Sequence, residues 1–294
     1  MKVVVSAAGE YRSELTRIDL HRLWMQRSET SQPQVTHLAD HQYRRPICFL
    51  TDAKQAPIYR SGHEVQPGTI MVSSPHAEYH YRVAAKARLG FMSLTPEDLA
   101  AAGRAVAGYD LTAPAVTQVL RPPDHLMSRL LRLHEAAGHL AASAPDILAH
   151  PEVARAIEQE LVRAMIGCLT DRETVATKAP GRQRLSIMRR FEQVLGENPG
   201  TPLYLAEICA AVGVSERTLR HQCMEHLGVS PHRYLWLRRM NLARHALLAA
   251  DPGAKTVTQI ATDHGFWELG RFSVAYRNLF GESPVQHLRQ TRRA

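Results

Sequence analysis

Cysteine is scarce in this sequence, and the few cysteines present form no pattern typical of a metal site or a disulfide framework. They are Cys48, Cys168, Cys209 and Cys223. There is no CxxC pair and no repeated spacing, whereas structural zinc sites and small secreted domains generally show one or the other. We therefore expect no metal, no cofactor and a reducing compartment such as the cytoplasm.

Long apolar runs are missing as well. No stretch approaches the roughly 18 apolar residues that a membrane-spanning helix needs. The apolar run Val3–Ala8 near the N-terminus is too short for the core of a signal peptide. The composition, with 45% hydrophobic and 22% charged residues, is that of a globular protein, and 294 residues are enough for two domains. The sequence thus predicts a soluble cytoplasmic protein with no membrane partner.

Acidic residues are under-represented in one part of the chain. Residues 1–180 contain 20 Lys and Arg against 19 Asp and Glu, whereas residues 181–294 contain 16 against 9. Of those 16 cations, 15 are arginine, which can fork onto a phosphate or a guanine. A basic segment of this size favours a polyanion, because cations near phosphates release condensed counterions. The charge therefore indicates nucleic acid binding by the C-terminal part, and a solvated basic surface is the alternative.

The N-terminal part, up to about residue 120, contains short apolar segments separated by turn residues. Segments rich in β-branched and aromatic residues recur about every ten residues, with Pro, Gly, Ser and Asp between them. Short strands at this spacing predict a small β-sandwich or β-barrel. The predicted strands are Ile47–Thr51, Pro57–Tyr59, Thr69–Ser73, Glu78–Val83 and Leu89–Leu94.

Helical periodicity replaces the strand pattern after Pro122. Two apolar stripes follow, with steps of three and four residues, and a break at Ser143–Pro145 separates them. This pattern predicts an antiparallel helical pair over residues 124–170. One apolar stripe can pack on the strands. The remaining apolar surface either packs on the strands as well or forms the contact with a second copy of the chain in a homodimer. The predicted domains are residues 1–170 and 185–294, joined by a polar linker at 171–184.

A helix–turn–helix pattern lies in the C-terminal part. Leu205–Val212 carries apolar residues at i, i+3, i+4 and i+7, which is the stripe of a short buried helix. Gly213 suits the left-handed conformation that ends a helix, and Ser215 is a good N-cap for the next one. That second helix would bury Leu219 and Cys223. A short turn between two such helices is typical of DNA-binding helix–turn–helix units.

The pattern occurs twice. Ile208 lies five residues before Gly213, and Ile260 lies five residues before Gly265. After one extra residue in the second turn, the copies match at an offset of 53 residues. Matching core, turn and cap positions are hard to produce by chance. The matched residues are Leu219 with Phe272, Cys223 with Tyr276, Leu227-Gly228 with Phe280-Gly281, Ser230-Pro231 with Ser283-Pro284, and Leu235 with Leu288.

The C-terminal third of the chain, about residues 185–290, resembles the DNA-binding domain of the AraC/XylS family of transcription regulators. The resemblance implies seven helices with two helix–turn–helix units. Residues 1–170 resemble, more loosely, the cupin-like sensor domain of such regulators, through Gln66–Met71 and Leu94–Leu99. The expected fold class is therefore α+β, with an N-terminal cupin-like β-barrel and a C-terminal all-α domain. The stretches that carry the resemblance are Ile260-Ala261, Gly265-Phe266, Leu269–Phe272, Tyr276-Arg277, Phe280–Pro284 and Leu288-Arg289.

The second helix of each unit supplies the predicted DNA contacts. In the first unit, the resemblance places Arg217, Arg220 and His221 at base-reading positions, and these side chains can reach guanine or phosphate. In the second unit, Gly270 and Val274 cannot donate a hydrogen bond to a base edge. We therefore predict that the first unit discriminates between bases and the second mainly positions the domain. The predicted DNA-contacting residues are Arg217, Thr218, Arg220, His221, Arg271, Ser273, Val274 and Arg277.

The N-terminal part offers weaker candidates for a ligand site. A small barrel can hold one small molecule, and Arg82 could pair with a carboxylate ligand. The HxxxH pairs His37/His41 and His76/His80 fall in predicted strand or loop, where such residues lie about 13 Å apart, so no metal site is predicted. Surface or core roles are open for each candidate. The predicted effector-binding residues are His76, Tyr79, His80, Tyr81 and Arg82.

Together these patterns predict an effector-responsive transcription activator and not an enzyme. Its predicted partners are double-stranded DNA, RNA polymerase, a small-molecule effector and a second copy of the chain. Two rigidly joined units should enter successive major grooves about 34 Å apart, on an asymmetric site of roughly 15–20 base pairs. The alternatives are a constitutive regulator whose N-terminal part only dimerises, and a metal-dependent cupin enzyme fused to a DNA-binding domain.

Overall fold

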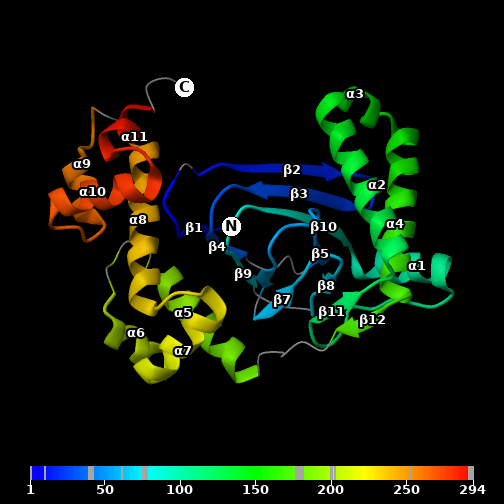
Figure 1. Cartoon of the computed structure of the whole chain (residues 1–294), viewed down its shortest axis with the longest axis horizontal. Helices are drawn as coiled ribbons and strands as arrows, with labels where there is room; N and C mark the ends of the chain where they lie inside the picture. Colours follow the sequence, from blue (N-terminus) through cyan, green and yellow to red (C-terminus); the bar gives the residue numbers. More distant parts are fainter. Residues whose placement is uncertain are drawn as a thin grey trace.

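The computed structural model consists of a sheet-rich N-terminal part and a helical C-terminal part, which lie side by side (Figure 1). It describes residues 2–9, 11–38, 43–60, 62–74, 79–175, 182–198, 201, 203–251 and 253–290. Within these residues, no helix combines the length and the apolar character needed to cross a membrane.

The N-terminal part contains two antiparallel sheets. The smaller sheet has the order β1-β4-β9-β6-β7, and the larger has the order β12-β11-β8-β5-β10-β3-β2. The strands of the smaller sheet are Lys2–Val5 (β1), Gln34–Leu38 (β4), Tyr79–Val83 (β9), Ile58–Arg60 (β6) and His63–Val65 (β7). Those of the larger sheet are Glu173–Val175 (β12), Gln118–Arg121 (β11), Ile70–Val72 (β8), Arg45–Leu50 (β5), Ala87–Leu94 (β10), Trp24–Thr30 (β3) and Ser13–Asp19 (β2).

The prediction of a closed barrel is wrong, because each sheet has two ends. One end of the smaller sheet is β1, which packs on helices of the C-terminal part and does not pair with the larger sheet. Val4, Val5 and Val35 belong to the apolar cluster of those helices. The five predicted strands overlap β5, β6, β8, β9 and β10, and the other strands were missed.

Alternation along the strands of the larger sheet divides the N-terminal core into two layers. Cys48 and Leu50 of β5 face the smaller sheet, where they pack with Ile58 and Tyr81. Ile47 and Phe49 belong to the opposite layer, which helices cover. The covering helices are Pro96–Ala107 (α1), Asp124–Ser143 (α2), Pro145–Leu148 (α3) and Pro151–Thr170 (α4).

The predicted helical pair at 124–170 is present as α2 and α4, which pack together. The buried residues of α2 include Met127, Leu130 and Ala137, together with His134, whose burial the apolar pattern did not predict. The predicted linker 171–184 contains β12, which pairs with β11, and the first residues of the next helix.

The C-terminal part is a set of helices around one apolar cluster. The long helix α8 runs through its middle, with the other helices arranged along it (Figure 1). The helices are Arg182–Glu197 (α5), Leu205–Val212 (α6), Glu216–Leu227 (α7), Pro231–Ala249 (α8), Val257–Asp263 (α9), Leu269–Phe280 (α10) and Pro284–Gln290 (α11).

The two parts of the chain share a buried contact between β1 and α8. The Asn241 side chain on α8 accepts a hydrogen bond from the Val5 backbone N–H at 3.2 Å and donates one to the Val5 carbonyl at 3.3 Å. Asn241 also donates to the carbonyl of Leu237, one turn earlier, at 2.8 Å. The Asn241 amide therefore pairs with the Val5 backbone N–H and carbonyl at the outer edge of β1, much as a neighbouring strand would.

Candidate DNA-binding interface

The first predicted helix–turn–helix has the expected local geometry. Gly213 has φ 75° and donates its N–H to the Cys209 carbonyl at 2.9 Å, which ends α6 in a left-handed turn. Ser215 caps α7, because its hydroxyl accepts from the Thr218 N–H at 3.2 Å. Leu219 and Cys223 are buried, as predicted from the apolar spacing.

The opposite face of α7 is exposed and carries the predicted base-reading residues Arg217, Arg220 and His221. Arg220 donates to the Glu216 carboxylate at 3.0 Å, and the His221 ring lies 3.4 Å from the carboxylate of Glu225. Both contacts lie on the surface, where such pairs contribute little to stability and are readily exchanged for another anion. The predicted contact Thr218 is half-buried and takes part in the N-cap, so it is less available than its neighbours.

The second helix pair, α9 and α10, has a similar turn with a different N-cap. Gly265 has φ 76°, which matches the left-handed turn of the first pair. The residue at the start of α10 is Glu268, and its side chain makes no capping hydrogen bond to the backbone. That carboxylate instead pairs with Arg271 at 2.9 Å. Trp267, in the turn itself, is 75% exposed.

The exposed face of α10 is less polar than that of α7. Its predicted contacts Arg271, Ser273, Val274 and Arg277 are all exposed, and Val274 is 63% exposed. Gly270 is exposed as well, with open space where a side chain would be. Two of these five positions have no side-chain donor or acceptor, so this face offers fewer hydrogen bonds to a base edge.

Aromatic residues fix α10 from the inside. Phe266, Phe272, Tyr276 and Phe280 form a chain of ring contacts with centroids 4.7–5.5 Å apart. The Tyr276 hydroxyl forms a hydrogen bond of 2.6 Å with Nδ1 of the buried His287 on α11. Burial raises the pKa of Tyr276, so its hydroxyl stays protonated.

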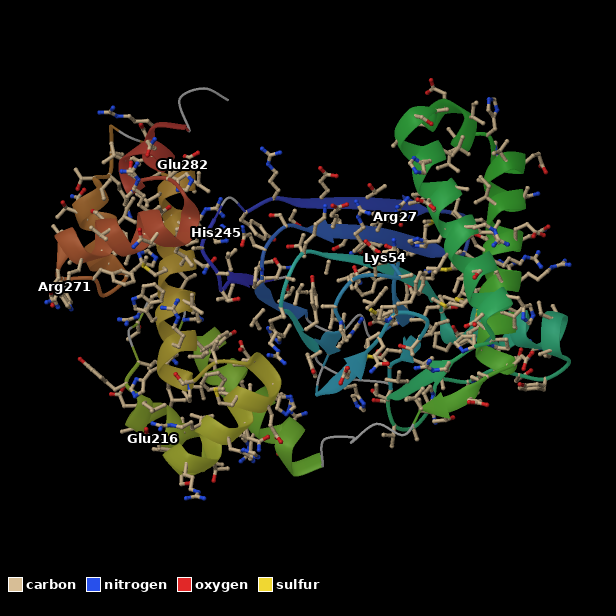
Figure 2. The ribbon with its side chains drawn as sticks, viewed as in Figure 1. Arg27, Lys54, Glu216, His245, Arg271 and Glu282 are labelled. Atoms are coloured by element: carbon tan, nitrogen blue, oxygen red, sulfur yellow. The ribbon has the colours of Figure 1, made fainter. Side chains whose placement is uncertain are left out.

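The helix α8 joins the two pairs rigidly. Near its start, the buried Tyr234 hydroxyl donates to the Glu192 carboxylate of α5 at 2.8 Å. Near its middle, Arg239 donates to the Gly265 carbonyl at 3.4 Å and lies over the Phe266 ring. Glu216 of α7 and Arg271 of α10 both lie on the side of the helical part that is away from the sheets (Figure 2). The two exposed helix faces are therefore held on one side of the molecule.

Comparison with known proteins agrees with this geometry. Residues 208–290 match the family model described as a helix-turn-helix domain. The chain is 33% identical over 191 residues to the probable thc operon regulatory protein of Rhodococcus erythropolis, covering 62% of this chain and 55% of that protein. It is 30% identical over 129 residues to the XylDLEGF operon transcriptional activator of Pseudomonas putida, covering 44% and 38%.

Among solved structures, an AraC-type transcriptional regulator from Chromobacterium violaceum is 32% identical, covering 36% of this chain and 91% of that one, with a TM-score of 0.32. Through residues 208–290, the C-terminal part of this chain is similar to transcription regulators of the AraC/XylS type. The chain spans about half, or less, of the length of the two curated relatives.

Of the predicted effector residues, Tyr81 and Arg82 lie on opposite faces of β9. Tyr81 is 5% exposed in the core between the sheets, where burial raises its pKa. Arg82, the next residue on β9, is half-buried on the other face, where its guanidinium lies over the Tyr59 ring. His76 lies outside the described residues, as do the side chains of Tyr79 and His80, so these predictions stay untested.

Sequence reasoning missed a buried polar group between the sheets. Arg60 is 2% exposed, with its guanidinium over the ring of Phe91 at 5.4 Å. His63 and Cys48 are buried in the same part of the structure. Burial lowers the pKa of His63 and raises that of Cys48. A single Arg or His in a three-residue strand has no sequence signal of burial. The described residues contain no group of three His, Cys, Asp or Glu arranged to hold a metal ion.

Proposed function

We propose that this protein is a transcription activator that binds a specific double-stranded DNA site with two helix–turn–helix units and responds to a small molecule. The observation that carries the proposal is the pair of cationic helix faces, α7 and α10, held on one side of the molecule by α8. The match of residues 208–290 to a helix-turn-helix family model supports it independently. In this proposal RNA polymerase is the protein partner, and the protein acts in the cytoplasm.

The two units are assigned different roles in DNA recognition because their exposed side chains differ. Arg217, Arg220 and His221 give the first unit donors that suit guanine O6 and N7. The second unit contributes Arg271 and Arg277, which suit phosphates. Base discrimination is therefore assigned to α7, and orientation on the duplex to α10.

The contact between β1 and α8 supports a coupling of the N-terminal part to DNA binding. Asn241 and Val5 join the two parts through buried hydrogen bonds, and β9 packs on α7. A ligand that binds one arrangement of the sheets better than another would change the population of DNA-binding conformations. Residues 1–170 form the sensor part in this proposal, and they have the capacity to form a homodimer.

Selection from a pool of random duplexes tests the proposed DNA binding. We expect the full-length chain to enrich one asymmetric sequence of about 15–20 base pairs, protected on one face of the duplex. A lack of enrichment over the starting pool would contradict sequence-specific binding. Enrichment with an affinity that no small molecule changes would instead support the constitutive alternative.

A further inference from the structure

A groove on the N-terminal part has the shape and charge of a small-molecule site. It has a volume of about 600 Å³ and lies between α1, α4 and the turn from β2 to β3. These elements lie on the side of the molecule that is away from the C-terminal helices (Figure 1). The groove is therefore separate from the proposed DNA-binding faces and from the core between the sheets.

Small side chains on α1 create the groove. Ala101, Ala102 and Ala105 recur at three- and four-residue steps and face α4, so they leave space where larger residues would fill it. Leu94 and Val162 complete the apolar lining. The floor is thus a surface of methyl groups and short apolar side chains, which suits the hydrocarbon body of a ligand.

The two carboxylates in the groove already have partners. Glu158 accepts hydrogen bonds from the backbone N–H groups of Arg22 at 2.6 Å and Leu23 at 3.1 Å. Asp98 accepts from the Thr95 hydroxyl at 2.8 Å and lies 3.6 Å from the Arg22 guanidinium. These contacts fix the β2–β3 turn on α4 and the start of α1. They also reduce the capacity of both carboxylates to neutralise the other cations.

The cations along the groove face solvent. Arg155 and Arg163 are both exposed and lie eight residues apart on α4, which corresponds to about 12 Å along the helix. Arg155 lies 3.7 Å from Glu152, a carboxylate that is itself 86% exposed, so this pair is weak. An anion at either end of the floor would therefore meet an available guanidinium, which can bind a carboxylate with two hydrogen bonds.

We propose that this groove binds an amphipathic carboxylate, with its apolar body on the alanine floor and its carboxylate on Arg155 or Arg163. The volume lies within the range of roughly 300–1,000 Å³ that is usual for small-molecule sites. A protein partner fits less well, because the large apolar side chain exposed here is Val106, at 43%. The inference rests on the proposed function in one respect, namely that the bound carboxylate is the effector.

Calorimetric titration of the full-length chain tests the site with two pairs of probes, octanoate with octanamide and 2-naphthoate with 2-naphthamide. We expect at least one carboxylate to bind ten-fold or more tightly than its amide. Arg163→Gln or Arg155→Gln should remove most of this preference, and Arg132→Gln, at an exposed position on α2, should leave it unchanged. Ala105→Phe, which fills the groove at an exposed position, should abolish binding of both members of the pair.

Three outcomes would overturn the proposal. Two are equal binding of carboxylate and amide, and binding that Ala105→Phe leaves unaffected. The third is a shift from dimer to monomer when Ala105→Phe is examined by sedimentation, because this shift would assign the groove to contact with a second copy of the chain. Fluorescence anisotropy on the selected DNA site separates this failure from failure of the proposed function. Specific DNA binding without carboxylate binding overturns the groove alone, and carboxylate binding without specific DNA binding overturns the proposed function. Carboxylate binding that leaves DNA affinity unchanged overturns the effector assignment.

Discussion

At the scale of single residues, the exposed faces of α7 and α10 differ in their capacity to donate hydrogen bonds. At the 53-residue offset between the two units, Arg217 of α7 corresponds to Gly270 of α10, and Arg220 corresponds to Ser273. Both faces carry positive charge, so both can approach phosphates. The difference predicts that the two halves of the DNA site tolerate base changes unequally.

Substitution of Arg220 by alanine tests this difference. We expect Arg220→Ala to weaken binding to the selected site by about 1–3 kcal/mol and to relax discrimination at one base pair, because one bidentate donor is lost. Arg277→Ala on α10 is the matched change, and it should weaken binding about equally on all sequences. Anisotropy titrations on the site and its single-base variants measure both effects. An equal loss on every sequence for Arg220→Ala would contradict its base-reading role.

A buried histidine should make stability depend on pH. His134 is 1% exposed beside the Phe49 ring, and burial, together with the charge of Arg27, lowers its pKa to about 4. The unfolded chain, with a histidine pKa of about 6.5, then binds the proton at a higher pH than the folded chain does. Stability contributed by the neutral ring is therefore complete above about pH 6.5 and falls as the pH drops towards 4.

Urea unfolding at pH 7.5 and pH 5 measures this dependence. The part due to His134 should be about 2 kcal/mol between these two values. His134→Leu removes the titrating group, so the variant should lose less stability than the parent chain on acidification. The same loss in both proteins would show that His134 does not carry the dependence.

At the scale of elements, the C-terminal helices could be predicted well because their information is local. Apolar residues at three- and four-residue steps indicate the helices, and in the first unit Gly213 and Ser215 mark the end of one helix and the start of the next. The turn at Gly213 and the cap at Ser215 are confirmed in detail. The repeat then added the long-range information that a single unit lacks.

The N-terminal strands depend on partners far away in the chain, so their pattern was less informative. β2 and β12 are edge strands with mostly exposed residues, and both read as polar segments. The outer edge of β1 is covered by α8, whose Asn241 lies 236 residues after its hydrogen-bond partner Val5. Burial of Arg60 also arises from the packing of two sheets, which single-strand patterns do not contain.

Two glycines with matched geometry test the contact between β9 and α7. Gly108 ends α1 and Gly228 ends α7, with φ 83° and 70°, and each donates its N–H at 3.2 Å to the residue four positions earlier. A methyl group at Gly108 would meet open space, whereas at Gly228 it would meet the Arg82 guanidinium.

Gly108→Ala should cost about 1–2 kcal/mol from backbone strain, and Gly228→Ala should cost more because it also displaces Arg82. The additional Arg82→Ala change should bring the cost at Gly228 close to that at Gly108. Chemical denaturation of five proteins gives these differences: the parent chain, the two glycine variants, Arg82→Ala, and the double variant of Arg82 and Gly228. Equal costs for the two single variants would mean that β9 does not lie against the end of α7.

At the scale of the whole molecule, the shared apolar cluster predicts that the two parts unfold together. Val5 is 1% exposed and packs with the C-terminal helices. Val5→Asp would bury a charge at this contact, so we expect the single calorimetric transition of the parent chain to divide into two. Leu15→Asp, at a 54% exposed position on β2, is the control and should leave one transition. Two transitions in the parent chain itself would contradict the coupling.

Under the proposed function, the rigid joint made by α8 constrains the spacing of the DNA site. Its 19 residues fix both the separation and the rotation between α7 and α10. Because DNA turns once in about 10.5 base pairs, inserting five base pairs between the two half-elements would place one of them on the far side of the double helix. We therefore expect base changes within the second half-element to be tolerated. An insertion or deletion of a few base pairs between the two half-elements should instead abolish activation.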